Sequence, residues 1–153
     1  MKIQIITVGK RNNPNLDGLI SDYNKRISST VVVNWLIIPS NSQAQDKARL
    51  IESENILAKI KPNDTVWLCD ERGDQISSTS LSNKLQTLKN TGINRLVIII
   101  GGAYGVDDKL KDRADWVWSF SKMVFPHQIM RLLVIEQLYR ALQIERGSGY
   151  HHA

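Results

Sequence analysis

Residue types that could do chemistry gather in three segments of this chain. Segments 69–73 (CDERG) and 101–105 (GGAYG) each follow an apolar run, and segment 120–125 (FSKMVF) leads into Pro126-His127. A thiol, paired carboxylates, a glycine turn and an imidazole could support nucleophilic attack, proton transfer or close backbone contact with a ligand. These segments are therefore the first candidates for a functional site.

Three of the side chains also have simpler interpretations. Asp70 and Glu71 are adjacent, and neighbours in an extended chain point to opposite sides, so we do not expect a proton-sharing dyad. We expect Cys69, at the end of an apolar run, to be a small buried side chain rather than a nucleophile. His127, at the head of a helix, could be a base, a phosphate contact or a capping group, and a lone histidine is more often structural.

The glycines at 101, 102 and 105 form a GGxxG pattern directly after a buried strand. This is neither the GxGxxG fingerprint of dinucleotide-binding proteins nor a phosphate loop, since no lysine follows it. It predicts either a turn whose backbone contacts a ligand or a tight strand-to-helix connection, and both remain open. The sequence also lacks HExxH, GxSxG and clustered His/Asp patterns, so we expect neither a metal site nor a serine hydrolase.

Strand and helix patterns alternate along the chain and position these segments. The alternation predicts a single α/β domain over residues 1–153, with a mainly parallel sheet flanked by helices. In such sheets, ligands bind beyond the carboxyl ends of the strands, where all three segments would lie in one pocket. We expect strands at 3–9, 31–38, 64–69, 95–100 and 116–119, and helices at 14–28, 42–60, 78–90, 107–113 and 128–146.

The last helix is apolar around nearly its whole circumference. A helix of this kind is buried on all sides, which in a chain of 153 residues indicates packing on its own sheet and on a partner chain. The net charge of +5 and the pI near 9.4 are compatible with an RNA partner. The basic residues occur in small groups, namely Lys10-Arg11, Lys25-Arg26, Lys109 to Arg113, Arg131, Arg140 and Arg146.

Other classes of protein are disfavoured by composition. A single cysteine, Cys69, excludes an internal disulfide, and no apolar run approaches the ~20 residues of a membrane span. The N-terminal MKIQIITVGK lacks the apolar core and cleavage site of a signal peptide, so we expect a cytoplasmic protein without a membrane partner.

Longer motifs give the chain a resemblance to a known family. Across essentially its full length it resembles the SPOUT class of ribosomal RNA methyltransferases, and within it the members that methylate N3 of a pseudouridine in 23S rRNA. Small departures occur at 103–104, where the family varies, and at 69–72, where a more apolar stretch is replaced. The matching motifs are TVGK at 7–10, LAKIKP at 57–62, IGG at 100–102, SFSKMVFPHQIMR at 119–131, IEQLYRA at 135–141 and Tyr150-His151.

The resemblance implies a fold, a cofactor and partners. It implies a trefoil knot in the C-terminal half that binds S-adenosylmethionine in a bent form, and a homodimer. It further implies a target in the helix 69 loop of the large subunit, methylated on assembled ribosomes. The implied cofactor-binding residues are Leu68, Cys69, Asp70, Gly101, Gly102, Gly105, Phe120, Ser121, Lys122, Met123, Val124 and Phe125.

The reaction that the resemblance implies assigns roles to four further residues. We expect His127, or His151 from the tail of either protomer, to accept the N3 proton or to position the base. Arg140 would support developing negative charge, and Tyr150 would stack on the base. Two rivals remain: a non-catalytic RNA-binding protein without cofactor affinity, and a nucleotide-binding hydrolase, which the missing phosphate-loop lysine disfavours.

Overall fold

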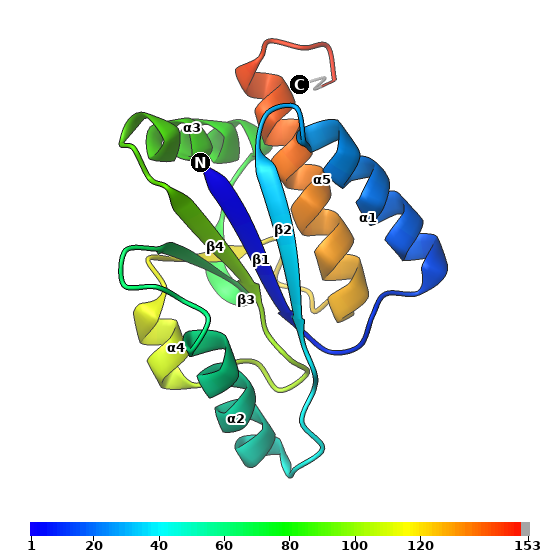
Figure 1. Cartoon of the computed structure of the whole chain (residues 1–153), viewed down its shortest axis with the longest axis vertical. Coiled ribbons are helices and arrows are strands. Elements are labelled where there is room, and N and C mark those ends of the chain that lie inside the picture. The colour runs from blue at the N-terminus through cyan, green and yellow to red at the C-terminus, as the bar shows by residue number, and fades with distance from the viewer. Residues whose placement is uncertain (151–153) are drawn as a thin grey trace.

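A computed structural model describes residues 1–150 and shows one five-stranded sheet with helices on both faces (Figure 1). The strand order is β2-β1-β4-β3-β5, and all neighbouring strands pair in parallel, which confirms the predicted α/β class. The elements are β1 (Lys2–Val8), α1 (Pro14–Ile27), β2 (Val32–Ile38), α2 (Gln45–Leu57), β3 (Thr65–Gln75), α3 (Ser78–Asn90), β4 (Arg95–Ile100), α4 (Asp108–Arg113), β5 (Trp116–Ser119) and α5 (His127–Glu145).

The sheet divides the core into two apolar layers because alternate strand residues face opposite sides. On one face Ile3, Ile5 and Ile98 pack against α1, α3 and α5, and on the other Ile6 and Ile99 pack against α2 and α4. Figure 1 shows α1 and α5 side by side on one side of the sheet, with α2 and α4 on the other. All five strands therefore end at the same edge of the sheet, where the three candidate segments begin.

Strand β3 is longer than the sequence predicts. We expected it to end at Cys69, but it continues to Gln75 after a register shift between Cys69 and Asp74. Pairing with β4 stops at Cys69, and pairing with β5 resumes at Asp74 and Gln75. The segment 70–73 is thus a bulge within a strand rather than a loop beyond it. The polar sequence of this segment could not predict a strand, because its extended conformation is stabilised by pairing with β5, which lies far away in the sequence.

Helix α2 is shorter than expected at both ends. Asn41 accepts a hydrogen bond from Gln43 N, and this turn delays the helix start to Gln45. Hydrogen bonds from Lys59 N to Ile56 O and from Ile60 N to Leu57 O tighten the chain at the other end. The bounds of α5 differ from the prediction by a single residue, since Pro126 takes the N-cap position.

Much of the apolar circumference of α5 is covered within the chain. Ser82 of α3 donates to Ala141 O, Tyr23 of α1 lies against Tyr139, and Arg131, Val134 and Leu138 are buried beneath. The side chains of Ile129 and Leu133 are only partly buried, and Leu132, also partly buried, packs against the core. None of the helices in the described part of the chain is long and apolar enough to cross a membrane.

Candidate functional site

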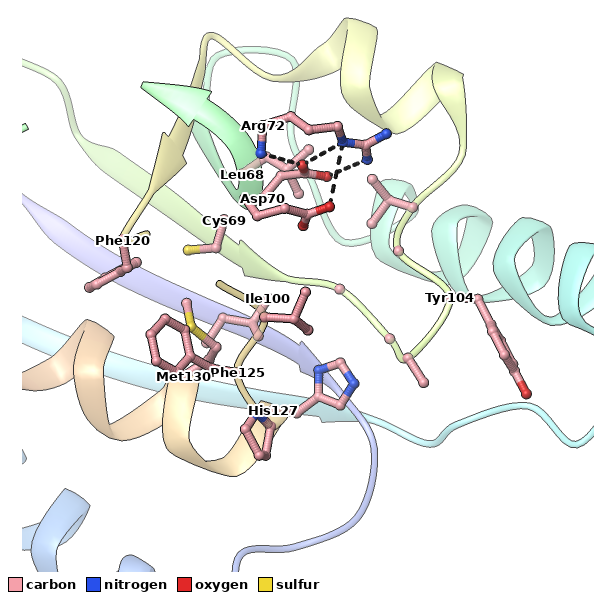
Figure 2. A pocket seen from close by; sticks show the side chains of 18 of the residues that line it. Leu68, Cys69, Asp70, Arg72, Ile100, Tyr104, Phe120, Phe125, His127 and Met130 are labelled. Carbon is pink, nitrogen blue, oxygen red and sulfur yellow. Dashed lines mark hydrogen bonds and ion pairs between the residues drawn. The ribbon is translucent and has the colours of Figure 1, made fainter. Parts of the chain in front are cut away.

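A cavity of about 710 Å³ opens at the carboxyl ends of β3 and β4 (Figure 2). All three segments contribute to it, so the structure brings together residues that lie far apart in the sequence. His127 and Met130 from the start of α5 close one side. The expected cofactor residues that line it are Leu68, Cys69, Asp70, Gly101, Gly102, Gly105, Phe120, Ser121, Met123, Val124 and Phe125, whereas Lys122 is exposed and does not line it.

The glycine turn forms the floor of this cavity and is held tightly from below. Gly105 N donates to Gly102 O at 2.9 Å, and Gly105 has a φ of +74°, which favours glycine. A Cβ on Gly102 would collide with Oε2 of Glu52, and a Cβ on Gly101 would lie 2.9 Å from Cγ1 of Val106. Close packing therefore disfavours any side chain at positions 101 and 102.

Helix α2 anchors the glycine turn through two buried neighbours. Glu52 accepts a hydrogen bond from Asn41 N at 2.7 Å through Oε1, while its Oε2 lies under Gly102 without a hydrogen-bond partner among the described residues. Ser53 accepts a hydrogen bond from Asp107 N at 2.9 Å, just beyond the turn. The turn therefore cannot move without disturbing α2, which fixes its backbone groups in the cavity.

The bulge at 70–73 is organised by an ion pair, as the dashed lines in Figure 2 show. Arg72 donates to both carboxylate oxygens of Asp70, at 2.8 and 2.7 Å, and lies 3.8 Å from Oε1 of Glu71. Hydrogen bonding to Arg72 lowers the pKa of Asp70, so this carboxylate is ionised at neutral pH. Both carboxylates lie within 4.0 Å of the Arg72 guanidinium, so each interacts with a cation.

The wall from β5 to α5 is fastened to the bulge through Ser119. Its buried hydroxyl donates to Glu71 O at 3.2 Å and to Ser121 O at 3.0 Å. Beyond this point Met123 and Val124 are 71% and 83% exposed, so they form an open rim. The thiol of Cys69 does not offer a nucleophile, because burial, followed by the nearby Asp70 carboxylate, raises its pKa to about 12.

His127 lies at the first turn of α5 with its ring toward the cavity (Figure 2). Burial lowers the pKa of this imidazole, the nearby Arg131 cation lowers it further, and Glu52 opposes both. The ring is therefore neutral at physiological pH, with one nitrogen able to accept a proton or a hydrogen bond.

Arg140 and Tyr150 lie outside this cavity. The Arg140 guanidinium pairs with Glu136 at 2.6 Å and lies 4.9 Å from the centre of the Tyr150 ring. Burial, together with the hydrogen bond shared with the Tyr23 hydroxyl, raises the pKa of Tyr150. Arg140 follows His127 by 13 residues on one helix, about 20 Å along its axis. The fourth expected catalytic residue, His151, lies outside the described residues.

Sequence reasoning missed several residues that line the cavity. Gln45 comes from the start of α2, and Val106 from the exit of the glycine turn, whereas Tyr104 lies in the candidate segment 101–105 but was not among the expected cofactor residues. Position within 101–105 could have indicated Tyr104, but Gln45 carries no local signal because its place depends on how the sheet is ordered. No group of three or more His, Cys, Asp or Glu residues is arranged for a metal within residues 1–150.

Comparison with known proteins gives one consistent result. The family model described as "Predicted SPOUT methyltransferase" matches residues 1–151. Three relatives, each covering 99% of both chains, have the name "Ribosomal RNA large subunit methyltransferase H". They come from Flavobacterium psychrophilum at 42% identity, Flavobacterium johnsoniae at 40% and Leuconostoc citreum at 39%.

Proposed function

This chain belongs to the SPOUT methyltransferase family, and from that premise we propose that it transfers a methyl group from S-adenosylmethionine to N3 of a pseudouridine in 23S rRNA. The observation that carries the proposal is the cavity built from three strand-end segments in a chain that matches its relatives end to end. The relatives' name supports the large-subunit RNA as substrate. The helix 69 loop and the assembled ribosome are the more specific target that we propose.

The cavity suits a cofactor of this size and polarity. Its volume of about 710 Å³ lies in the range of sites for small organic ligands, and its lining is largely apolar. The glycine turn offers backbone groups at a floor that a Cβ would fill, and Leu68 to Asp70 and residues 120–125 would enclose the rest. When bound, S-adenosylmethionine supplies an electrophilic methyl group on a sulfonium.

Calorimetry with S-adenosylmethionine tests this part of the proposal. Gly102→Val places a branched side chain where Glu52 already lies, so we expect its affinity to fall at least tenfold while Gly18→Ala binds like the unaltered chain. Heat-detected binding that is the same for all three proteins would place the cofactor elsewhere. No binding by any of them would support a non-catalytic protein.

His127 is the residue of this chain that we propose to act on the substrate base. The N3–H of pseudouridine is weakly acidic, and it must lose its proton as the methyl group arrives. The neutral imidazole at the cavity wall could accept that proton or hold the base in line with the methyl group. Asp70 is less suited to this role, because Arg72 occupies both of its oxygens.

A homodimer would reconcile the positions of the expected catalytic residues. Within one chain Arg140 and Tyr150 lie about 20 Å along α5 from His127. The half-exposed apolar residues Ile129 and Leu133 lie on the outward face of the same helix. We propose that two α5 helices pack through this face, so that Arg140 of the partner subunit approaches the cavity.

Mixing two inactive variants tests this arrangement. His127→Ala and Arg140→Ala chains, refolded together, form mixed dimers in which one of the two sites is intact. A two-fold dimer then predicts recovery of about one quarter of the activity. Recovery of none, with both variants folded and dimeric, would mean that each site takes both residues from one chain.

The substrate proposal is tested by transfer of labelled methyl groups to two ribosome preparations. One preparation has normal 23S rRNA and the other lacks its pseudouridines. Label in the first alone supports the proposed target, whereas label in both would move the target to uridine or another base. Gly102→Val is the control for a contaminating methyltransferase.

A further inference from the structure

The loop that joins β1 to α1, residues 9–13, is fastened to the start of α5. Arg131 donates to Lys10 O at 2.8 Å and to Asn12 Oδ1 at 2.6 Å. Asn13 N donates to Gln128 Oε1 at 2.8 Å. Gly9, with a φ of 126°, permits the turn, and a Cβ there would lie 3.3 Å from the Arg131 guanidinium. The loop is therefore held in one conformation.

This loop lies next to the cavity. Gln128, which binds Asn13, directly follows His127 on α5, and His127 lines the cavity. In the view of Figure 2, the chain that leaves β1 runs beside the labelled His127. A nucleotide reaching the cavity would bring its neighbouring backbone near residues 9–13.

The loop and its anchor carry three cations that form no ion pair with the described residues, although Asp17 lies near them and accepts a hydrogen bond from Asn12. Lys10 and Arg11 are exposed, and neither takes part in an ion pair formed within residues 1–150. Arg131 is 1% exposed, and its hydrogen bonds go to carbonyl, hydroxyl and amide oxygens, with no carboxylate of the described residues within 4.0 Å. The carboxylate of Asp17 acts from nearby, but burial dominates and lowers the pKa of Arg131.

The other arginines contrast with this arrangement. Counting only partners within residues 1–150, six of the nine arginines pair with a carboxylate, and the other three are Arg11, Arg131 and Arg146. Two of these three belong to the loop and its anchor. Arg26, in the other exposed basic pair of the N-terminal half, is bound to Asp22 at 2.8 Å.

A buried guanidinium without a carboxylate is costly, and two further cations held close by add repulsion. An external anion would offset both the cost of burying the guanidinium and the repulsion among the cations. A rigid loop also loses little conformational freedom on binding, so its contacts contribute more fully to affinity. Phosphodiester groups are the anions that accompany a nucleotide into such a site, and contacts to them set its register.

We propose that residues 9–13 dock the phosphate backbone of the RNA strand beside the target nucleotide. Lys10 and Arg11 make the contacts, and Arg131 positions the loop and adds its charge from below. This inference rests on the proposed function, since it names how the RNA of that same site is held.

The test compares two double variants that lose the same charge. Lys10→Ala/Arg11→Ala removes the loop cations, and Lys59→Ala/Lys61→Ala removes two exposed lysines near the start of β3, at the opposite edge of the sheet. None of the four side chains takes part in an ion pair among residues 1–150. The measurements are the affinity for ribosomes over a salt series, the affinity for S-adenosylmethionine, and KM and kcat for ribosomes.

We expect the loop variant to bind ribosomes more weakly and with a salt slope reduced by about 2, one for each phosphate contact. Its loss should appear in KM, with cofactor affinity intact, and the control pair should keep the slope of the unaltered chain. Equal slopes in all three proteins would overturn the inference. A loss of affinity without a change of slope would also overturn it, and would indicate a ribosomal protein as the contact.

The binding data are read independently of methyl transfer. An unaltered chain that binds ribosomes but transfers no methyl group refutes the proposed function, while the slopes still decide whether the loop contacts phosphate.

Discussion

Replacing Gly102 by alanine is predicted to lower the free energy of unfolding by about 1–3 kcal/mol, the cost of inserting a methyl group into a packed site. Its Cβ would overlap Glu52 Oε2 and lie 3.3 Å from both Glu52 Cδ and Val8 Cγ1. Val8 belongs to the sheet and cannot retreat, so Glu52 must move. That movement would weaken its hydrogen bond to Asn41 N, now 2.7 Å long.

A double-mutant cycle isolates the collision. Glu52→Ala leaves Asn41 N without its acceptor, but it does so whether residue 102 is glycine or alanine. In the Glu52→Ala background, the alanine at 102 should therefore cost within about 0.5 kcal/mol of zero, which gives a coupling energy of about 0.5–3.5 kcal/mol. Gly18→Ala in α1 is the control, since nothing lies within 4 Å of its Cβ, and helix propensity predicts a gain of about 0.5–1 kcal/mol.

Chemical denaturation followed by tryptophan fluorescence measures these values, and Trp67 and Trp118 report from the core beside the cavity. The reasoning is refuted if Gly102→Ala costs the same with and without Glu52. A cost of Gly102→Ala below about 0.5 kcal/mol in the otherwise unaltered chain would refute it equally.

Three further predictions concern single side chains. Burial lowers the pKa of His127, so as the pH falls below about 6.5 the imidazole is protonated in the unfolded chain before it is protonated in the folded one, and the free energy of unfolding decreases. Methyl transfer should lose its base at a still lower pH. His127→Asn should remove this part of the pH dependence of stability, and an unchanged pH dependence would contradict the lowered pKa of His127. Arg131→Met removes the donor to Thr7 Oγ1, Val8 O and Lys10 O. We expect the free energy of unfolding, measured by chemical denaturation, to fall by at least about 2 kcal/mol. A decrease under about 0.5 kcal/mol would show that Arg131 does not hold the loop. With a pKa of about 12, the Cys69 thiol should resist alkylation by iodoacetamide at pH 7.5 in the folded protein. Cys69→Ala should keep its methyl-transfer activity. Rapid alkylation or an inactive variant would contradict a purely packing role for Cys69.

The sequence was informative where structure depends on local pattern. RLVIII predicted β4 with its observed bounds, because an apolar run stopped by two glycines has few alternatives. The same argument placed segments 101–105 and 120–125 after strands, as observed, whereas 70–73 lies within β3; the cavity brings all three segments together. The functional roles of their residues remain predictions.

The parts that could not be predicted depend on distant contacts. The polar continuation of β3 to Gln75 is stabilised by β5, more than 40 residues later in the chain. Arg131 looked like another basic residue, and only its place in the apolar repeat with Val134 and Leu138 indicated burial. The distance of Arg140 from His127 follows from the rise per residue of one continuous helix, so these two expected catalytic residues cannot meet within one chain.

Identification of the modified nucleoside tests the central claim most directly. Ribosomes that lack this methylation would be incubated with the protein and S-adenosylmethionine, and their 23S rRNA digested and analysed by mass spectrometry. We predict one new nucleoside, 3-methylpseudouridine, formed by the unaltered chain and not by Gly102→Val. A methyl group on another base or another RNA, or none despite bound cofactor, would contradict the proposed function.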